Sequence, residues 1–169
     1  MNDTEIFIIG ANGQLGRALC SRYPNARFAD KDELDITDRD SVMQFDWSGI
    51  KYLLNAAAYT NVDGAETPEG RKDAWLVNTT AVAHLTEAAI SRDMTLVHVS
   101  TDYVFDGSSE VHTETEPFSP LSVYGASKAA GDTAAGLAQK HYIIRTSWVI
   151  GEGKNFVNTM RMLAERDIS

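Results

Sequence analysis

The 169-residue sequence has little cysteine and a shortage of positive charge. Its one cysteine, Cys20, excludes an intrachain disulfide framework, and a reducing compartment is expected. Since no histidine lies near it in the sequence, Cys20 is interpreted as a packing residue of the first helix and not as a nucleophile. Acidic residues outnumber basic ones, which gives a formal net charge of −9. Nucleic acid and anionic membranes are therefore not expected as partners, because both attract basic surfaces.

Long apolar runs are also absent from the sequence. The segment before the first apolar run is short and acidic. Neither a signal peptide nor a membrane-spanning stretch follows it, so a cytoplasmic protein is expected. The hydrophobic share of 43% and the charged share of 23% are typical of a globular domain with its own core. We expect one domain without internal repeats and without a metal site.

The N-terminal stretch organises the rest of the sequence. Residues 6–9 are four consecutive apolar residues, which predict a strand buried on both faces. Gly10, Gly13 and Gly16 follow at intervals of three, and residues 15–19 have helical spacing. Strand, glycine turn and helix are the context of a dinucleotide-binding fingerprint, in which the glycines serve the tight turn, the approach to pyrophosphate and helix–sheet packing in that order. A glycine-rich loop without a ligand is the alternative.

Four further apolar runs alternate with helical patterns along the chain. The runs predict strands at residues 27–30, 52–58, 95–100 and 142–145. Helices are expected after Asp38 and over residues 71–92, 122–140 and 156–165. This alternation predicts an α/β fold with a Rossmann-like, doubly wound parallel sheet, strand order 3-2-1-4-5 and helices on both faces. Ligands of such sheets bind at the carboxyl ends of the strands.

Several residues at the predicted strand ends suit a ligand. The small side chains of Ala56, Ala57 and Ala58 follow the third strand and leave room for a flat molecule, with packing against a helix as the alternative. Thr101 and its neighbouring carboxylate follow the fourth strand. Asp30, after the second strand, lies about where an acid contacts an adenosine ribose, although a solvated loop acid is an equal interpretation.

Two polar residues fall on faces that are otherwise apolar. Residues 71–92 carry an inward stripe that includes Trp75, Asn78 and Leu85. Asn78 on that stripe needs buried partners; we interpret it as a structural residue that bonds backbone, with a proton relay as the alternative. His98, inside the fourth strand, is interpreted as a packed histidine and not as a catalyst.

Tyr124 and Lys128 are four residues apart at the start of a predicted helix, so they share a face. A lysine ammonium beside a tyrosine favours the phenolate and lowers the tyrosine pKa, which makes Tyr124 a candidate general acid. The hydroxyl of Thr101 could hold a substrate carbonyl or tune the tyrosine. Such a pair alone is common on exposed helix faces, but its combination with the glycine turn favours catalysis.

These motifs, in this order, resemble the extended short-chain dehydrogenase/reductase family. Within it, several stretches are similar to the dTDP-4-dehydrorhamnose reductases: residues 10–16, 55–63, 100–107 and 144–149, and also Gly153-Lys154-Asn155-Phe156-Val157. The resemblance spans essentially the whole chain.

The resemblance implies roles for individual residues. Tyr124 would donate a proton, Lys128 would bind the nicotinamide ribose, and Thr101 takes a place often held by serine. Asp102 and Trp148 would contact the sugar nucleotide, together with Thr101. Tyr124 and Lys128 also match cofactor positions, with the following residues: Gly10, Gly13, Gln14, Leu15, Gly16, Asp30, Asp35, Ile36, Ala56, Ala57 and Ala58.

The resemblance also implies a reaction, the NAD(P)H-dependent reduction of the C4 ketone of dTDP-4-dehydro-6-deoxy-L-mannose to dTDP-L-rhamnose. NADPH is the expected cofactor: Asp30 would favour NADH through a free 2′-hydroxyl, whereas Lys31 could pair with the 2′-phosphate of NADPH. The expected partners are a dTDP-sugar and a second copy in a homodimer.

Members of this family continue beyond the length of this chain. We therefore expect residues 1–169 to be the NAD(P)-binding Rossmann domain, with the C-terminal substrate-binding lobe largely absent, and the chain could be inactive alone. The alternative function is that of a non-catalytic NADP-binding regulatory subunit, as in the β subunit of methionine adenosyltransferase, which resembles the same fold.

Overall fold

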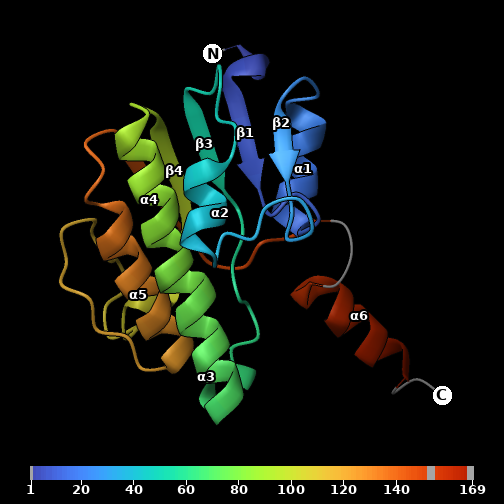
Figure 1. The fold of residues 1–169 in the computed structure, drawn as a ribbon. Coiled ribbons are helices and arrows are strands. Elements are labelled where there is room, and N and C mark those ends of the chain that lie inside the picture. Colours follow the sequence, from blue (N-terminus) through green and yellow to red (C-terminus); the bar gives the residue numbers. More distant parts are fainter. Residues whose placement is uncertain (1, 152–154, 167–169) are drawn as a thin grey trace.

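A five-stranded, all-parallel sheet forms the centre of the protein (Figure 1). The structure is a computed structural model that describes residues 2–151 and 155–166. Gly153 and Lys154 of the last resembling stretch lie outside the described residues. The strands are β1 (Ile6–Ile9), β2 (Arg27–Ala29), β3 (Tyr52–Asn55), β4 (Thr95–Thr101) and β5 (His141–Thr146). The helices are α1 (Gln14–Arg22), α2 (Arg39–Gln44), α3 (Pro68–Trp75), α4 (Ala81–Ser91), α5 (Val123–Ala135) and α6 (Phe156–Arg166). The predicted doubly wound α/β class is confirmed.

The predicted strand order 3-2-1-4-5 is wrong, because the sheet runs β2-β1-β3-β4-β5. β3 pairs with β1, in a register that matches Ile6 with Tyr52 and Ile9 with Asn55, and does not extend the sheet beyond β2. After β2 the chain returns through α2 past β1 and adds β3 at the other edge of β1. The predicted order failed because β3 is equally apolar in either place, so its own sequence does not say which edge it joins.

The reversal of direction at β1 places helices on both faces of the sheet, as predicted. Parallel strands are joined by right-handed crossovers, so connections that run in opposite directions lie on opposite faces. On one face, Ile6, Ile8 and Leu54 pack against α1 and the half-buried Cys20, which confirms Cys20 as a packing residue. On the other face, α2 and α4 cover β1, β3 and β4 with these buried residues: Phe7, Ile9, Val42, Leu53, Val82, Leu85 and Leu96.

The long helix predicted over residues 71–92 is divided by one wide turn. A π-helical segment, η3 (Leu76–Thr80), separates α3 from α4. A π turn holds an extra residue, which shifts the helical period on either side of it. Asn78 and Leu85 are buried as predicted, whereas Trp75 is 41% exposed, which corrects its place on the inward stripe.

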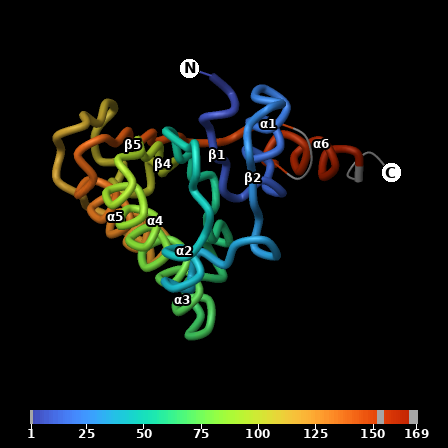
Figure 2. Tube along the Cα trace, turned by 45° about the horizontal axis from the view of Figure 1, so that its top comes forward, coloured from blue at the N-terminus to red at the C-terminus, as the bar shows by residue number. Residues whose placement is uncertain are grey.

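The last helix lies apart from the layers just described. Figures 1 and 2 show α6 beside the α1–β2 end of the sheet and away from α4 and α5. Apolar residues such as Phe156, Met160 and Leu163 of this helix are more than 40% exposed. Among the described residues, no helix is both long and apolar enough to cross a membrane.

Candidate cofactor and catalytic site

A cavity of about 760 Å³ opens at the carboxyl edge of the sheet. Its walls include the segments that follow all five strands and the first turns of α5. Connections leave β1 and β3 in opposite directions, and this switch point is where an open α/β sheet binds its ligand. All the predicted site residues except Gly16 line this cavity: Gly10, Gly13, Gln14, Leu15, Asp30, Asp35, Ile36, Ala56, Ala57, Ala58, Thr101, Asp102, Tyr124, Lys128 and Trp148.

The glycine turn forms one end of the cavity. Gly10 has φ +78°, and a Cβ there would lie 2.7 Å from the Ala57 nitrogen, so the turn needs glycine for both reasons. Gly16 lies behind the cavity wall. A Cβ there would lie 2.0 Å from the Gly10 carbonyl oxygen, so glycine at this position lets α1 pack closely against the turn. Gly13 caps α1, whose first backbone N–H groups face outward at its positive end.

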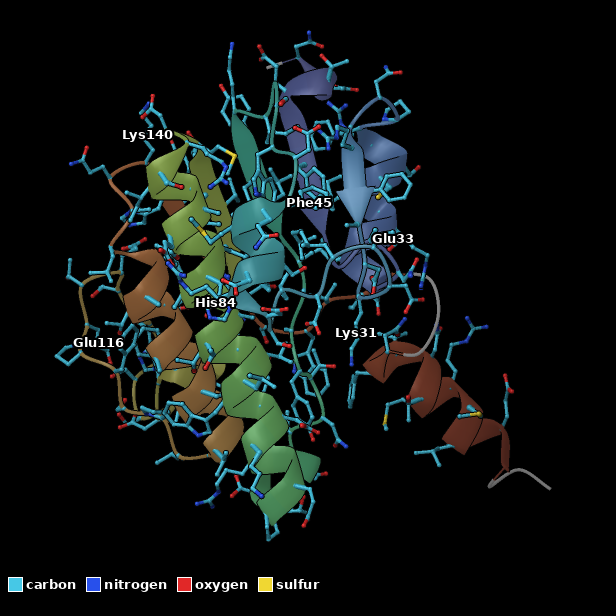
Figure 3. All side chains as sticks on the ribbon, in the orientation of Figure 1. Lys31, Glu33, Phe45, His84, Glu116 and Lys140 are labelled. Carbon is cyan, nitrogen blue, oxygen red and sulfur yellow. The ribbon has the colours of Figure 1, made fainter. Side chains whose placement is uncertain are left out.

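Asp30 lines the cavity, and backbone groups occupy both of its carboxylate oxygens. The Asn12 N–H donates to Oδ2 at 2.8 Å, and the Lys31 N–H donates to Oδ1 at 2.8 Å. Asp30 therefore ties the glycine turn to the end of β2. Neither interpretation of the sequence, a ribose contact or a solvated loop acid, predicted this structural role. Lys31 lines the same part of the cavity (Figure 3).

Tyr124 and Lys128 project from the first turns of α5, which Ser122 caps by accepting a hydrogen bond from the Gly125 N–H at 3.0 Å. Lys128 is only 1% exposed, and its ammonium donates to the Val99 carbonyl at 2.8 Å. Burial lowers the Lys128 pKa to about 8, because a charged ammonium is poorly solvated there. Lys128 thus ties α5 to β4 at the cavity wall.

The environment of Tyr124 raises its pKa above the usual value. Burial is the largest cause, the charge of Asp102 adds to it, and interaction with the Thr101 hydroxyl acts in the opposite direction. The expected lowering by Lys128 is therefore corrected: the ammonium donates to a β4 carbonyl and is not among the causes that shift the Tyr124 pKa, of which burial is the largest. The phenol is therefore protonated at neutral pH, as a proton donor must be, and the raised pKa makes it a weaker acid than an unperturbed tyrosine.

Asp102 and Trp148, the residues predicted to contact the sugar nucleotide, have different surroundings. Asp102 accepts a hydrogen bond from the Thr101 hydroxyl at 3.1 Å. Trp148 is 62% exposed and packs on Phe156 of α6 with ring centroids 4.6 Å apart. Across the cavity, Gln14 Nε2 donates to the carbonyl next to Trp148, that of Val149, at 3.1 Å. This bond joins the start of α1 to the segment after β5.

Asn78 is satisfied by backbone and one side chain, as its structural interpretation predicts. Its Oδ1 accepts from the Tyr59 N–H at 2.9 Å, and its Nδ2 donates to the Tyr59 carbonyl at 3.1 Å and to Ser127 Oγ at 3.0 Å. The bond to Ser127 ties the wide turn η3 to α5, and the bonds to Tyr59 tie it to the segment after β3. His98, the other polar residue of an apolar face, is fully buried inside β4 and outside the cavity wall.

The sequence reasoning missed part of the wall. The Tyr103 ring meets the Tyr124 ring edge-on, with centroids 5.8 Å apart, and both line the cavity. Thr60 and Val62 line it from the segment after β3. All three lie inside the stretches that carry the resemblance, so position within those stretches was the available signal.

The sequence matches a known protein family over nearly its whole length. A profile of the family described as "RmlD substrate binding domain" matches residues 4–169. The chain belongs to this family. A dTDP-4-dehydrorhamnose reductase of Aggregatibacter actinomycetemcomitans is 47% identical over 96% of this chain and 58% of the relative. One from Mycolicibacterium smegmatis is 39% identical over 96% of this chain and 51% of the relative.

Solved structures of the same family have the same fold. A dTDP-4-dehydrorhamnose reductase from Bacillus anthracis, determined in complex with NADP, has a TM-score of 0.88 and 37% identity over 95% of this chain and 59% of that chain. The reductase from Clostridium acetobutylicum has a TM-score of 0.87 and 38% identity with the same coverage. This chain thus spans little more than half the length of the relatives it matches.

Proposed function

We propose that this chain is the cofactor-binding part of an NADPH-dependent reductase that converts dTDP-4-dehydro-6-deoxy-L-mannose to dTDP-L-rhamnose. One observation carries the proposal: Tyr124, Lys128 and Thr101 lie in the same cavity as the glycine turn. The names of the relatives support the substrate class. A non-catalytic NADP-binding subunit would need the cavity but not this trio.

The residues present fit a nicotinamide dinucleotide. The cavity volume lies within the range usual for cofactor sites, and the start of α1 offers backbone N–H groups for a pyrophosphate. Gly13 would let the phosphates approach, Ala56, Ala57 and Ala58 would flank the flat rings, and Lys128 would bind the nicotinamide ribose. When bound, NADPH supplies the hydride.

We infer a preference for NADPH over NADH from the end of β2. Both Asp30 oxygens accept from backbone N–H groups, which fixes the carboxylate at the end of β2, and each oxygen keeps a second lone pair. Lys31 lines the same end of the cavity and would pair with a 2′-phosphate. The NADP complex of the Bacillus anthracis relative agrees with this choice.

The proton of the reduction would come from Tyr124. A ketone that accepts a hydride at C4 becomes an alkoxide, and the phenol of Tyr124 would protonate that oxygen as it forms. Tyr124 holds this proton at neutral pH, and the alkoxide, a much stronger base than the phenolate, takes it as it forms. The Thr101 hydroxyl, which donates to Asp102 in this structure, would turn to donate to the same oxygen, and Asp102 and Trp148 would contact the sugar nucleotide.

Two measurements test the proposal. Calorimetric titration of the 169-residue chain with NADPH and NADH should show binding of both, tighter for NADPH. A chimera that joins this chain to the remaining part of the Aggregatibacter relative should then reduce the dTDP-keto-sugar with oxidation of NADPH. Binding of neither cofactor by a folded chain would refute the cofactor site. Binding by a chimera that does not turn over would favour the non-catalytic alternative.

A further inference from the structure

Three polar side chains form a buried series beneath the cavity, from the end of β3 to the middle of α5. Asn55, His98 and Asp132 are each at most 1% exposed. Within residues 2–151 and 155–166, His98 Nε2, Asp132 Oδ1 and Ser100 Oγ, which also acts on the Asp132 carboxylate, are buried without a geometric hydrogen bond, and His98 Nε2 and Asp132 Oδ1 lie 3.7 Å apart. Buried polar atoms are rarely left unpaired in native folds, so this pair of atoms needs a physical reason.

The direction of the hydrogen bonds is set at the cavity end. The Ala57 N–H donates to Asn55 Oδ1 at 3.1 Å, and a backbone N–H can only donate. The Asn55 amide is therefore turned so that its Nδ2 faces His98 Nδ1 at 3.1 Å and donates to it. His98 Nδ1 must then hold a lone pair. A neutral His98 in this position carries its proton on Nε2.

The other end is an acceptor. His98 Nε2 faces Asp132 Oδ1 at a separation about 0.5 Å beyond an ordinary N–H···O bond, so a small shift closes it. The second oxygen, Oδ2, accepts from Arg145 Nε at 3.0 Å. Arg145 itself is held between two rings, with its guanidinium 5.4 Å from the Phe105 centroid and 5.2 Å from that of Phe118. Since arginine has no acceptor, Oδ2 cannot become a donor.

We propose that Asp132 is a positioning residue: by accepting the His98 Nε2–H bond, it keeps the Asn55 amide turned to hold the Ala57 N–H at the cavity wall. Each group along the series donates to the next one, from the Ala57 N–H to the Asp132 carboxylate. Turning any one group around would bring two donors or two acceptors face to face. Burial lowers the His98 pKa to about 3, which keeps the ring neutral, as this direction requires. Ala57 lines the cavity, so the series ends at the proposed nicotinamide site.

The tautomer of His98 in the wild-type chain is the first test. Long-range 1H–15N correlation spectra of the imidazoles distinguish the two neutral tautomers, and single substitutions of His84, His112 and His141 assign the His98 signals. We expect a neutral ring with its proton on Nε2 at pH 7. A proton on Nδ1, or a charged ring, overturns the proposal without any variant of the buried series having to fold.

The variant Asp132→Asn tests whether the direction depends on the carboxylate. Arg145 requires the amide oxygen, so the new NH2 group must face His98 Nε2–H. We expect His98 to move its proton to Nδ1, Asn55 to turn over, and hydrogen exchange of the Ala57 amide to quicken about tenfold. A wild-type tautomer together with wild-type exchange at Ala57 would show that Asp132 has no positioning role.

A rescue separates positioning from mere stability. In Asp132→Asn/Arg145→Met the amide is free to turn its oxygen toward His98, so the wild-type tautomer and the slow Ala57 exchange should return. The matched control Arg145→Met loses its ring contacts but should leave both readouts unchanged. A double variant that stays like Asp132→Asn would contradict the proposal.

Only the effect on cofactor affinity rests on the proposed function. We expect Asp132→Asn to bind NADPH several-fold more weakly and the double variant to recover most of that loss. If the wild-type chain binds no NADPH, the proposed function fails, while the spectra and the exchange rates still decide the role of Asp132.

Discussion

Gly131→Ala should separate α5 from the wide turn of the helix beside it. A Cβ on Gly131 would lie 2.0 Å from the backbone oxygen of Asn78, and ordinary contact begins at 3.4 Å. Because the neighbour is backbone, no side-chain rotation relieves the clash, and the two elements must part by more than an ångström. That movement would stretch the bonds that Ser127 makes with Asn78 Nδ2 at 3.0 Å and Thr79 Oγ1 at 2.8 Å.

The expected loss follows from these contacts. Overpacking a buried site costs about 1–3 kcal/mol, and each weakened hydrogen bond costs about 1 kcal/mol. The better helix propensity of alanine returns about 1 kcal/mol. The net loss of about 2–4 kcal/mol corresponds to a fall in Tm of about 5–15 °C for a chain of this size.

The assay is thermal and urea unfolding followed by far-UV circular dichroism, with Gly136→Ala as the matched control on the same helix. A Cβ on Gly136 meets only carbonyl oxygens at 3.4 and 3.5 Å, and its φ of −64° suits alanine. The control should therefore unfold within about 0.5 kcal/mol of the wild type or be slightly more stable. If Gly131→Ala melts like the control, the close approach of α5 to Asn78 does not exist.

Three further substitutions test the site, and a fourth tests the buried His98. Tyr124→Phe keeps the ring, so calorimetric NADPH binding should survive while turnover of the chimera falls about a hundredfold or more; wild-type turnover would exclude Tyr124 as the proton donor. Lys128→Met should weaken NADPH binding as well as turnover, and unchanged affinity would remove Lys128 from the ribose site. Lys31→Ala should weaken binding of NADPH but not of NADH, and equal losses would contradict its pairing with a 2′-phosphate. The pKa of His98 is about 3 in the folded chain against an ordinary value of 6.5, so below pH 6.5 the unfolded chain binds a proton that the folded chain does not, and stability is lost. Between pH 7.5 and 5.5 the free energy of urea unfolding should therefore fall by about 1 kcal/mol more in the wild type than in His98→Gln. Equal losses in the two proteins would contradict a neutral buried ring.

The parts of the fold that the sequence predicts correctly are those with local causes. The apolar run at residues 6–9 and the glycines after it act within one turn of chain, and the structure confirms the buried strand and the tight turn at Gly10. Tyr124 and Lys128 share a helix face because of their spacing alone. The cavity collects nearly every predicted site residue because parallel strands end at one edge.

The failures have causes that lie far apart in the sequence. The residues of β3 are equally apolar whichever edge of β1 the strand joins, so they do not indicate the edge. Trp75 faces solvent because one wide turn shifts the helical period, and no pattern in the sequence marked that turn. The bonds of Asp30 to the Asn12 N–H, and of Asp132 to Arg145, join residues that only the finished fold brings together.

The positions of the three tryptophans give this chain two separate optical signals. Trp47 is 5% exposed, packs against the Phe7 ring with centroids 5.0 Å apart and donates Nε1–H to the Val42 carbonyl, so its emission reports the integrity of the core. Trp148 lines the cavity and is largely open to solvent, so energy transfer from its indole to a bound nicotinamide ring would report occupancy. Replacing the exposed Trp75, which lies outside the cavity wall, would leave a protein in which folding and cofactor binding can be followed by fluorescence in one titration.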